Sequence, residues 1–389
     1  MNNTTAGSDP QLPGWFLWGW PGCDFPVEEG KSPGAIGAVT FYTWALVPPA
    51  YLCLGTVGNF LTVLVISLGF NKIRSTDVML LALAVSDTVF LYSTALRRWL
   101  MHGFEIDLRK HSDFMCKMGI FLTYVSFQFS SLMLVLLTGE RVMCIVKPYS
   151  AKRICTTKTA TFATMVMLIF LGALNSHFLY GFGTSVIDIY QTVDRCGAEH
   201  EDYFVFFEFY YSWVHFIVGY TFPCVCIIAG NVVIIRGLWC SAFERRWKGS
   251  ATSQGSTSSQ HRDTQKRSLT VMLVTLNVIF FVTQTPACVY IVSYAHMIKE
   301  ANKFACTDFA TYKSMAGNIH LMEALIHNLA YLNSAINFLL YVVSGTRFRS
   351  HVRALITCRQ RNREPVTSLS RTLSVVNHTH EAFVLDSQL

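Results

Sequence analysis

The sequence predicts an all-α membrane protein: a seven-transmembrane helix bundle with its N-terminus outside the cell. Its 389 residues are 52% hydrophobic and 14% charged, whereas a typical soluble domain is about 25% charged. Six charge-free runs are long enough for the ~20 residues that cross a bilayer, and a seventh run contains a single charge. Basic residues gather on one side of these spans, which indicates their orientation.

The predicted spans follow one another along the chain. The six charge-free runs lie within residues 32–71, 118–139, 159–187, 209–235, 268–298 and 324–346. The run 78–96 carries Asp87, and a charge at this depth must face the bundle interior rather than lipid. We therefore expect an extracellular tail 1–40, a bundle 41–345, an amphipathic membrane-surface helix 346–358 and a disordered cytoplasmic tail 359–389.

The orientation follows from the basic residues, because positively charged loops stay on the cytoplasmic side. With the N-terminus outside, 21 of the 31 Lys and Arg residues lie in inner loops and the C-terminal tail. Topology and attraction to anionic lipid then explain the net charge of +7, without a nucleic-acid partner. Asn2 and Asn3 each begin an N-x-S/T sequon, which predicts glycosylation of an extracellular tail.

Four of the twelve cysteines are expected on the oxidising outer side, where they allow three pairings. They are Cys23, Cys116, Cys196 and Cys306. A bridge between Cys116 and Cys196 would hold the loop after the fourth span over the bundle. A bridge between Cys23 and Cys306 would tie the N-terminal tail to the last outer loop.

The largest inner loop is expected at residues 236–267, where the Gly/Ser/Thr-rich stretch GSATSQGSTSSQ predicts a flexible, disordered linker. The chain has no internal repeat of the kind that marks many transporters. It also contains no phosphate-binding loop, zinc spacing or nucleophile elbow. These absences argue against an enzyme.

The stretch LVLLTGERVMCIVKP, residues 134–148, places Glu140 and Arg141 side by side at the end of an apolar run. Cys116 lies 25 residues before Arg141, about 37 Å along a helix, so the two mark opposite ends of one span. This arrangement resembles the rhodopsin-like (class A) G-protein-coupled receptors, whose third helix begins with a bridged cysteine and ends with an acid-Arg-aromatic triad. Here Val142 replaces the aromatic residue.

The resemblance extends from about residue 40 to 358, because further motifs recur in order. They are Gly58-Asn59, residues 81–87 (LALAVSD), Pro223, Phe280, Pro286 and residues 337–341 (NFLLY). The family depends on no cofactor, and the resemblance implies activation of a heterotrimeric G protein by outward movement of the sixth helix. The residues expected to form this switch are Glu140, Arg141, Phe280, Pro286, Asn337 and Tyr341.

Two parts of the switch have a physical rationale. An ion pair between Glu140 and Arg141 at the membrane edge can hold the helix end closed, until a partner protein takes the guanidinium group. Pro286 removes a hydrogen bond inside its helix and can act as a hinge. The alternatives are a pair of solvated interfacial charges and a static kink.

Asp87 needs polar partners or a cation, because an unpaired buried carboxylate is costly. The resemblance implies a sodium ion as an allosteric ligand there. Its expected site comprises Asp87, Asn59, Ser130, Asn333, Ser334 and Asn337. The alternative is a hydrogen-bonded Asp87 that only joins helices.

Several positions depart from the family pattern. Gln284 replaces the aromatic residue two positions before Pro286, so ring rotation cannot be the trigger there. Asn231 stands where the fifth helix often has tyrosine, Phe338 replaces the usual proline of the seventh helix, and the fourth helix has no tryptophan.

The C-terminal segment predicts attachment to the inner membrane surface. Apolar residues recur at helical spacing from Phe348 to Ile356, with arginines between them, which is typical of an interfacial helix. Cys358 is a predicted palmitoylation site. Phosphates on Thr367, Ser368, Ser370, Thr372 and Ser374 would recruit arrestin after receptor kinases act.

The ligand is expected to be a peptide. Thr123 stands where amine receptors have an Asp, and residues 324–346 contain no Lys for a retinal Schiff base. The charged, aromatic outer loop 188–208 can hold both ends of a short, polar, amidated peptide. The seventh-span sequence resembles invertebrate FMRFamide-type and thyrotropin-releasing-hormone-type neuropeptide receptors. The expected ligand pocket comprises Arg97, Arg98, Thr123, Phe127, His177, Gln284, His320 and Glu323.

Three alternatives remain from the sequence alone. One is a receptor for a non-peptide small ligand. A second is a membrane metallohydrolase, because His320, Glu323 and His327 share one helix face. The third is a transporter or channel, which is disfavoured because no span aligns several ionisable groups.

Overall fold

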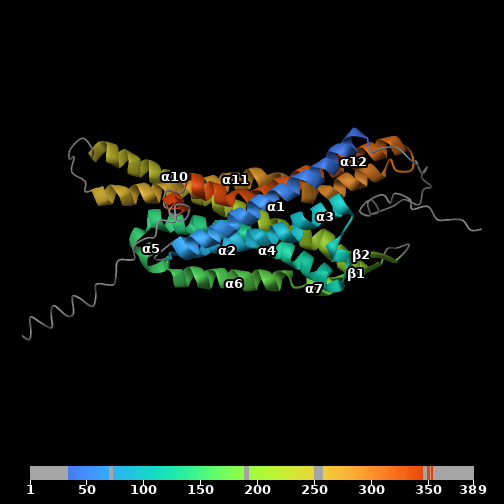
Figure 1. Cartoon of the computed structure of the whole chain (residues 1–389), viewed down its shortest axis with the longest axis horizontal. Coiled ribbons are helices and arrows are strands. Elements are labelled where there is room, and N and C mark those ends of the chain that lie inside the picture. Colours follow the sequence, from blue (N-terminus) through green and yellow to red (C-terminus); the bar gives the residue numbers. More distant parts are fainter. Residues whose placement is uncertain are drawn as a thin grey trace, which may run out of the picture.

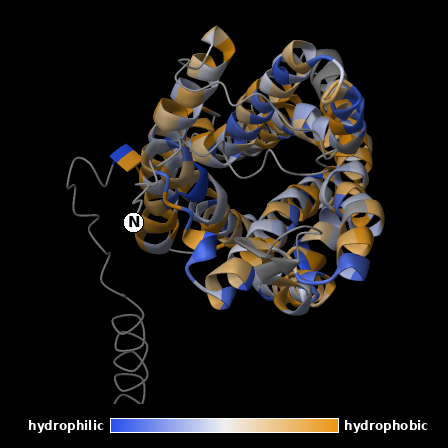
Figure 2. Ribbon diagram, turned by 90° about the vertical axis from the view of Figure 1, so that its right-hand side faces the viewer, coloured by the Kyte–Doolittle hydropathy of each residue, from blue (hydrophilic) through white to orange (hydrophobic). Residues whose placement is uncertain are grey.

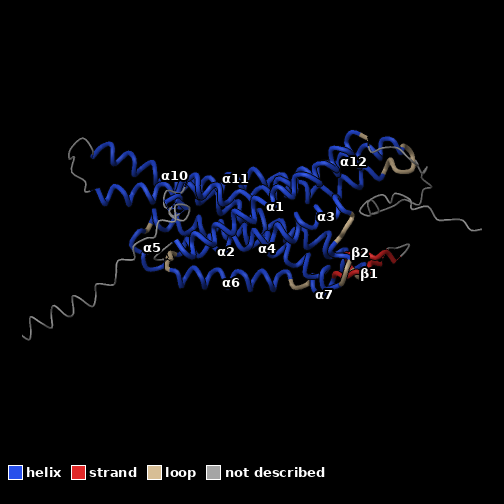
Figure 3. The backbone as a smooth tube through the Cα atoms, viewed as in Figure 1, coloured by secondary structure: helices blue, strands red, loops and turns tan. Residues whose placement is uncertain are grey.

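The computed structural model describes residues 34–69, 73–187, 192–248, 257–344, 348–350 and 352–353. Within these residues, seven helices are long and apolar enough to cross a membrane. They run side by side along the long axis of the molecule (Figure 1), and almost all of the described chain is helical (Figure 3). The predicted fold class, an all-α seven-helix membrane bundle, is confirmed.

Four spans are formed by α1 (Ala35–Gly69), α4 (Asp113–Val146), α11 (Thr257–Asn302) and α12 (Phe309–Ser344). The second span combines α2 (Ser75–Phe90), the π-helical turn η2 (Leu91–Leu96) and α3 (Arg97–Phe104). The fourth combines α6 (Thr157–Asn175) and α7 (Phe178–Gly181). The fifth runs through α8 (Glu201–Val205), η4 (Phe206–Tyr211), α9 (Ser212–Phe216), η5 (Ile217–Thr221) and α10 (Phe222–Lys248).

The two ends of the bundle carry different short elements. One end has the short helical turn η3 (Leu108–Lys110) and a hairpin of β1 (Phe182–Ile187) and β2 (Thr192–Ala198). The opposite end has α5 (Pro148–Ile154) (Figure 1). In the predicted orientation, the hairpin lies outside the cell and α5 lies inside.

α4 lies at the centre of the bundle and packs against α2, α6 and α10, while α1 packs against α2 and α12. The interior is filled by buried apolar side chains such as Met133, Ile227 and Phe280. Large apolar side chains such as Phe60 and Phe162 are exposed, and apolar residues cover much of the bundle exterior (Figure 2). This exterior suits lipid contact, because a hydrocarbon environment does not penalise apolar exposure.

Helix boundaries differ from the predicted runs, because a charged residue ends a charge-free run without ending a helix. α10 continues to Lys248 and α11 begins at Thr257. The prediction of a disordered loop over residues 236–267 is therefore wrong for residues 236–248 and 257–267, which are helical. α1 begins at Ala35, earlier than the predicted domain boundary at residue 41. α12 begins at Phe309 and includes the exposed Lys313 in its outer turns.

The predicted fourth run, 159–187, combines two kinds of structure. Its last residues, Phe182–Ile187, form strand β1 and pair antiparallel with β2. Lack of charge does not distinguish a helix from a strand, and the β-branched residues of this segment favour a strand.

The C-terminal surface helix is described only in part. Residues 348–350 and 352–353 are helical, and the ring of Phe348 lies 5.7 Å from those of Phe338 and Tyr341. Predictions for Asn2, Asn3, Cys23, Cys358 and the tail 359–389 lie outside the described residues.

Candidate functional site

At the inner end of α4, Glu140 and Arg141 form an ion pair, with Arg141 Nη2 2.7 Å from Glu140 Oε1. Thr76 at the start of α2 bridges the pair, because its hydroxyl donates to Glu140 Oε1 at 2.5 Å and accepts from Arg141 Nη2. The three residues are 3–8% exposed. Glu140 and Arg141 are therefore held against a second helix and are not the solvated surface charges of the alternative interpretation.

This inner cluster is incompletely hydrogen-bonded. Glu140 Oε2 and Arg141 Nε are buried and have no hydrogen-bond partner among the described residues. A buried polar atom without a partner costs about 1–3 kcal/mol. These two unpaired atoms therefore offset part of the stabilisation that the ion pair supplies.

A second polar cluster joins three helices near the same end. Asn277 of α11 donates to Thr138 Oγ1 of α4 at 3.1 Å and to Asn231 Oδ1 of α10 at 3.0 Å. Asn277 is 2% exposed. The sequence analysis noted that Asn231 departs from the family pattern, but it did not identify Asn277. The only indication for Asn277 was an amide side chain within an apolar stretch.

Asp87 lies in the middle of the bundle and is 0% exposed. Ser130 donates to its Oδ1 at 3.0 Å, Asn337 donates to its Oδ2 at 2.6 Å, and the side chain of Ser334 is also hydrogen-bonded to it. Asn59 donates to the Ser334 carbonyl oxygen at 3.5 Å. Asn333, which precedes Ser334 in the sequence, is also buried. In the described structure it forms no hydrogen bond with Asp87.

The predicted switch also includes Phe280, Tyr341 and Pro286. Phe280 and Tyr341 are buried, and the Tyr341 hydroxyl has no hydrogen-bond partner in the described part of the chain. Pro286 lies inside α11, which continues on both sides of it. Gln284 is also buried, and its Oε1 has no hydrogen-bond partner within the described ranges.

At the outer end, an ion pair connects two of the predicted pocket residues. Arg98 Nη2 of α3 lies 2.6 Å from Glu323 Oε1 of α12, and His320 Nδ1 lies 3.7 Å from Glu323 Oε2. The guanidinium group of Arg98 also lies 5.3 Å from the ring centroid of Trp44. This cluster links α1, α3 and α12 and presents charge to a largely apolar bundle.

Arg97 has a different partner from Arg98. Its Nε and Nη2 each donate to one carboxylate oxygen of Asp107 at 2.8 Å. This bidentate geometry favours a stable pair, and hydrogen bonds and charge from Arg97, opposed by burial, lower the pKa of Asp107. Asp107 therefore compensates the charge of Arg97, as Glu323 does for Arg98, and the role of Arg97 in ligand contact stays a prediction.

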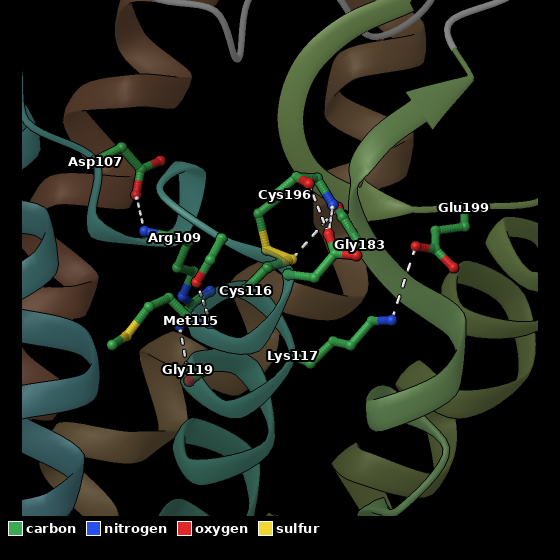
Figure 4. The surroundings of a disulfide bond; sticks show 12 residues. Asp107, Arg109, Met115, Cys116, Lys117, Gly119, Gly183, Cys196 and Glu199 are labelled. Atoms are coloured by element: carbon green, nitrogen blue, oxygen red, sulfur yellow. Dashed lines mark hydrogen bonds and ion pairs between the residues drawn. A yellow bond between two sulfur atoms is a disulfide. The ribbon is translucent and has the colours of Figure 1, made fainter.

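Arg109 is a candidate that sequence reasoning missed. It extends from η3 to α4, where its Nη2 donates to Thr123 Oγ1 at 2.9 Å and to the Gly119 carbonyl oxygen at 3.1 Å. Figure 4 shows its side chain between the loop of Asp107 and the helix of Gly119. No feature of the sequence places Arg109 beside Thr123.

His177 and Phe127 are not joined to the Arg98–Glu323 pair. His177 Nδ1 lies 2.7 Å from the Tyr203 hydroxyl, and its ring packs against Phe178, Phe206 and Tyr211. Phe127 packs against Phe90 and His215. Aromatic packing holds His177 between the fourth and fifth spans, and its part in ligand binding stays a prediction.

A disulfide joins Cys116 at the start of α4 to Cys196 in β2, as predicted (Figure 4). Thr184 of β1 also contacts α4, because its backbone N–H and its hydroxyl donate to Asp113 Oδ1 at 2.8 and 2.6 Å. Cys306 is disulfide-bonded as well. Its predicted partner, Cys23, lies outside the described residues.

Comparison with known proteins agrees with this architecture. A family model for the 7 transmembrane receptor (rhodopsin family) matches residues 58–341. The chain is 25% identical to the allatostatin-A receptor of Bombyx mori, covering 78% of this chain and 77% of that protein. It is 23% identical to the probable C-C chemokine receptor type 3 of Mus musculus, covering 79% and 77%. It is 25% identical to the thyrotropin-releasing hormone receptor of Bos taurus, covering 88% and 85%.

Proposed function

Because the chain belongs to the rhodopsin family of seven-transmembrane receptors, we propose that it binds an extracellular neuropeptide and activates a heterotrimeric G protein. Members of this family are receptors rather than enzymes, and the chain is a multi-pass membrane protein. The peptide binds at the outer end of the bundle. The G protein binds at the inner end, beside Arg141.

The observation that supports a peptide best is the charged outer cluster. Arg98 and Glu323 present opposite charges next to each other, and His320 adds a third polar group. A peptide offers amides, termini and polar side chains that such groups recognise. The names of the related receptors, which include allatostatin-A and thyrotropin-releasing hormone, support the same ligand class.

The test is a screen of synthetic neuropeptides on cells that express the chain, with intracellular calcium and cyclic AMP as readouts. We expect at least one peptide to give a saturable response that untransfected cells lack. No response to any peptide, despite verified surface expression, would contradict the proposal. A response only to non-peptide compounds would favour the alternative of a small-molecule receptor.

The metallohydrolase alternative has no support from the geometry of its proposed ligands. His320 and Glu323 contact each other, but Glu323 is paired with Arg98. His327 Nδ1 faces the Glu323 carbonyl oxygen at 2.9 Å. No group of three metal-binding side chains converges within the described residues.

Coupling depends on the polar contacts that hold the inner ends of the helices together. The outward movement proposed for α11 separates Asn277 from Thr138 and Asn231, while a G protein takes Arg141 from Glu140 and Thr76. A ligand can shift this equilibrium only by binding one arrangement more tightly than the other. The outer cluster on α3 and α12 provides contacts that can differ between the two arrangements.

Asn277→Leu is expected to raise basal signalling, because it removes two hydrogen bonds that hold α11 against α4 and α10. Loss of about 1–2 kcal/mol from the closed arrangement raises the open population about 5–30-fold. The measurement is ligand-independent nucleotide exchange on an added G protein. Thr275→Val is the matched control, because the Thr275 hydroxyl bonds only within its own helix, and equal basal rates in both variants would contradict the prediction.

A sodium ion is proposed as an allosteric ligand of Asp87. The donor set fits, because the Asp87 carboxylate and the hydroxyl oxygens of Ser130 and Ser86 lie together and a hard cation prefers oxygen ligands. Sodium would neutralise the buried carboxylate. Asn337 and Ser334 would hold the carboxylate in place from α12.

The sodium site predicts a specific effect on thermal stability. Exchanging sodium chloride for N-methylglucamine chloride at constant ionic strength is expected to lower the unfolding temperature of the wild type. A bound ion at ten times its dissociation constant contributes about 1.4 kcal/mol. Asp87→Asn should remove this dependence and the exposed control Asp308→Asn should keep it, whereas sodium dependence that survives Asp87→Asn would exclude this site.

The C-terminal tail is proposed to regulate the receptor. Receptor kinases would phosphorylate the Ser/Thr cluster at residues 367–374, and the added negative charge would recruit arrestin. Palmitate on Cys358 would hold the surface helix at the membrane. Glycans on Asn2 and Asn3 would mark the extracellular tail.

A further inference from the structure

We propose that Arg109 is a carboxylate-binding residue of the ligand site, so that the activating ligand carries an acidic side chain or a free C-terminal carboxylate. This inference rests on the proposed function as a receptor, and it restricts the activating ligand to one that carries a negative charge. Its basis is the pairing of charges at the outer end of the bundle.

Among the arginines at this end whose side chains the structure describes, Arg97 and Arg98 have carboxylate partners and Arg109 has none in the described part of the chain. Arg97 pairs with Asp107, and Arg98 pairs with Glu323. Arg109 forms no ion pair with any described residue; Asp107 accepts only its backbone N–H, at 3.1 Å. Of these three arginines, Arg109 is therefore the one whose guanidinium group has no carboxylate partner among the described residues.

Arg109 remains cationic although its surroundings disfavour the charge. Burial, together with the nearby charges of Arg97 and Arg98, lowers its pKa to about 9. A partly buried cation without a counter-ion is costly. A carboxylate that arrives with a ligand would remove this cost, so an anionic ligand gains affinity that a neutral ligand does not.

The guanidinium group is held in place and still has free donors. Its Nη2 bonds to Thr123 Oγ1 and Gly119 O, and more weakly to the Ser93 carbonyl oxygen at 3.4 Å. Its Nε is buried with no partner among the described residues, and its Nη1 forms no hydrogen bond there. Nε faces α4 and is closed to a ligand, so the two N–H groups of Nη1 remain for one, on a side chain whose orientation is already set.

Gly119 makes room for this side chain. A Cβ atom at Gly119 would lie 3.1 Å from Arg109 Nε and 3.4 Å from its Cγ, and the first of these distances is tighter than usual. Glycine therefore lets Arg109 lie against α4 without being displaced, whereas a larger side chain would push it away. Because Thr123 is a predicted pocket residue one turn further along α4, a ligand that reaches it also meets Arg109.

The experiment uses two sets of probes on the full-length receptor in cells. The first is a synthetic library of peptides of about three to ten residues, prepared as matched pairs that carry Asp or Asn, or a free or amidated C-terminus. The second is a panel of non-peptide mono- and dicarboxylic acids. The receptors are wild type, Arg109→Gln, Arg109→Lys, Gly119→Val and the control Lys110→Gln, which removes a neighbouring exposed charge.

We expect the acidic member of a pair to activate wild type more potently than its neutral twin. Arg109→Gln should weaken the acidic member about 10- to 100-fold and leave the neutral twin nearly unchanged. Arg109→Lys should recover part of the loss, Gly119→Val should reproduce it, and Lys110→Gln should have no effect. Equal loss for both twins would show a structural role for Arg109 and overturn the proposal.

The outcomes also separate this inference from the peptide-receptor proposal. If only amidated or neutral peptides activate the receptor, the peptide function stands and the carboxylate assignment fails. If a non-peptide carboxylic acid activates wild type but not Arg109→Gln, the assignment stands and the peptide function fails. Loss of potency restricted to free C-termini, or to acidic side chains, identifies which carboxylate Arg109 binds.

Discussion

Arg141→Ala is expected to abolish G-protein activation while ligand binding persists. Arg141 lies at the inner end of α4, where Glu140 and Thr76 hold its guanidinium group, and the proposed ligand site around Arg98 and Glu323 lies at the other end of the bundle. Alanine removes the group that the G protein is proposed to take. The measurement is agonist-stimulated nucleotide exchange in membranes, alongside binding of the same agonist.

Thr76→Val provides the companion variant. It keeps the ion pair but removes the hydroxyl that bridges Glu140 and Arg141, which are already incompletely hydrogen-bonded. Basal exchange should therefore rise in Thr76→Val and vanish in Arg141→Ala. Normal agonist-stimulated exchange in Arg141→Ala would remove the basis for the inner switch.

Glu323→Leu is expected to destabilise the receptor strongly, because it leaves Arg98 without a counter-ion. The side chains of Arg98 and Glu323 are 20% and 15% exposed, so the cost approaches but does not exceed the roughly 3 kcal/mol lost when one partner of a fully buried pair is removed. Adding Arg98→Met should restore most of this loss, since an apolar pair of similar size often replaces a buried ion pair without cost. The measurement is thermal unfolding of the four members of the double-mutant cycle.

The same cycle separates stability from recognition. If Arg98 and Glu323 also bind the ligand, the double variant should fold well but respond weakly to agonist. Glu300→Gln is the control, because the Glu300–Lys303 pair is exposed and exposed ion pairs contribute little to stability. A mild effect of Glu323→Leu, similar to that of Glu300→Gln, would show that the outer pair is not an important contact.

Features that depend on composition or on position along one helix were predictable from the sequence. Six spans followed from charge-free runs and the seventh from a run with a single charge, Asp87, whose inward position followed from the cost of exposing it to lipid. Cys116 and Arg141 marked the two ends of one helix because their separation matches the length of a span. These properties do not require knowledge of how the helices rotate against one another.

Contacts between distant segments could not be predicted in this way. Thr76 and Glu140 are 64 positions apart, and Asn277 and Thr138 are 139 apart. Their hydrogen bonds depend on how the helices are rotated and shifted against one another. In a bundle that faces lipid, the pattern of apolar residues along each span specifies this rotation and shift only weakly. The reach of Arg109 to Thr123 depends further on a short loop and on the missing side chain of Gly119.

The Cys116–Cys196 disulfide has a practical consequence for producing the protein. In a reducing cytosol these two thiols would stay reduced and the disulfide would not form. The β1–β2 hairpin would then be held to α4 mainly by the hydrogen bonds to Asp113 and by the Lys117–Glu199 pair, whose nitrogen and oxygen are 3.8 Å apart. Such surface contacts contribute little by themselves. Preparations for binding work should therefore come from a eukaryotic secretory pathway and be handled without thiol reagents.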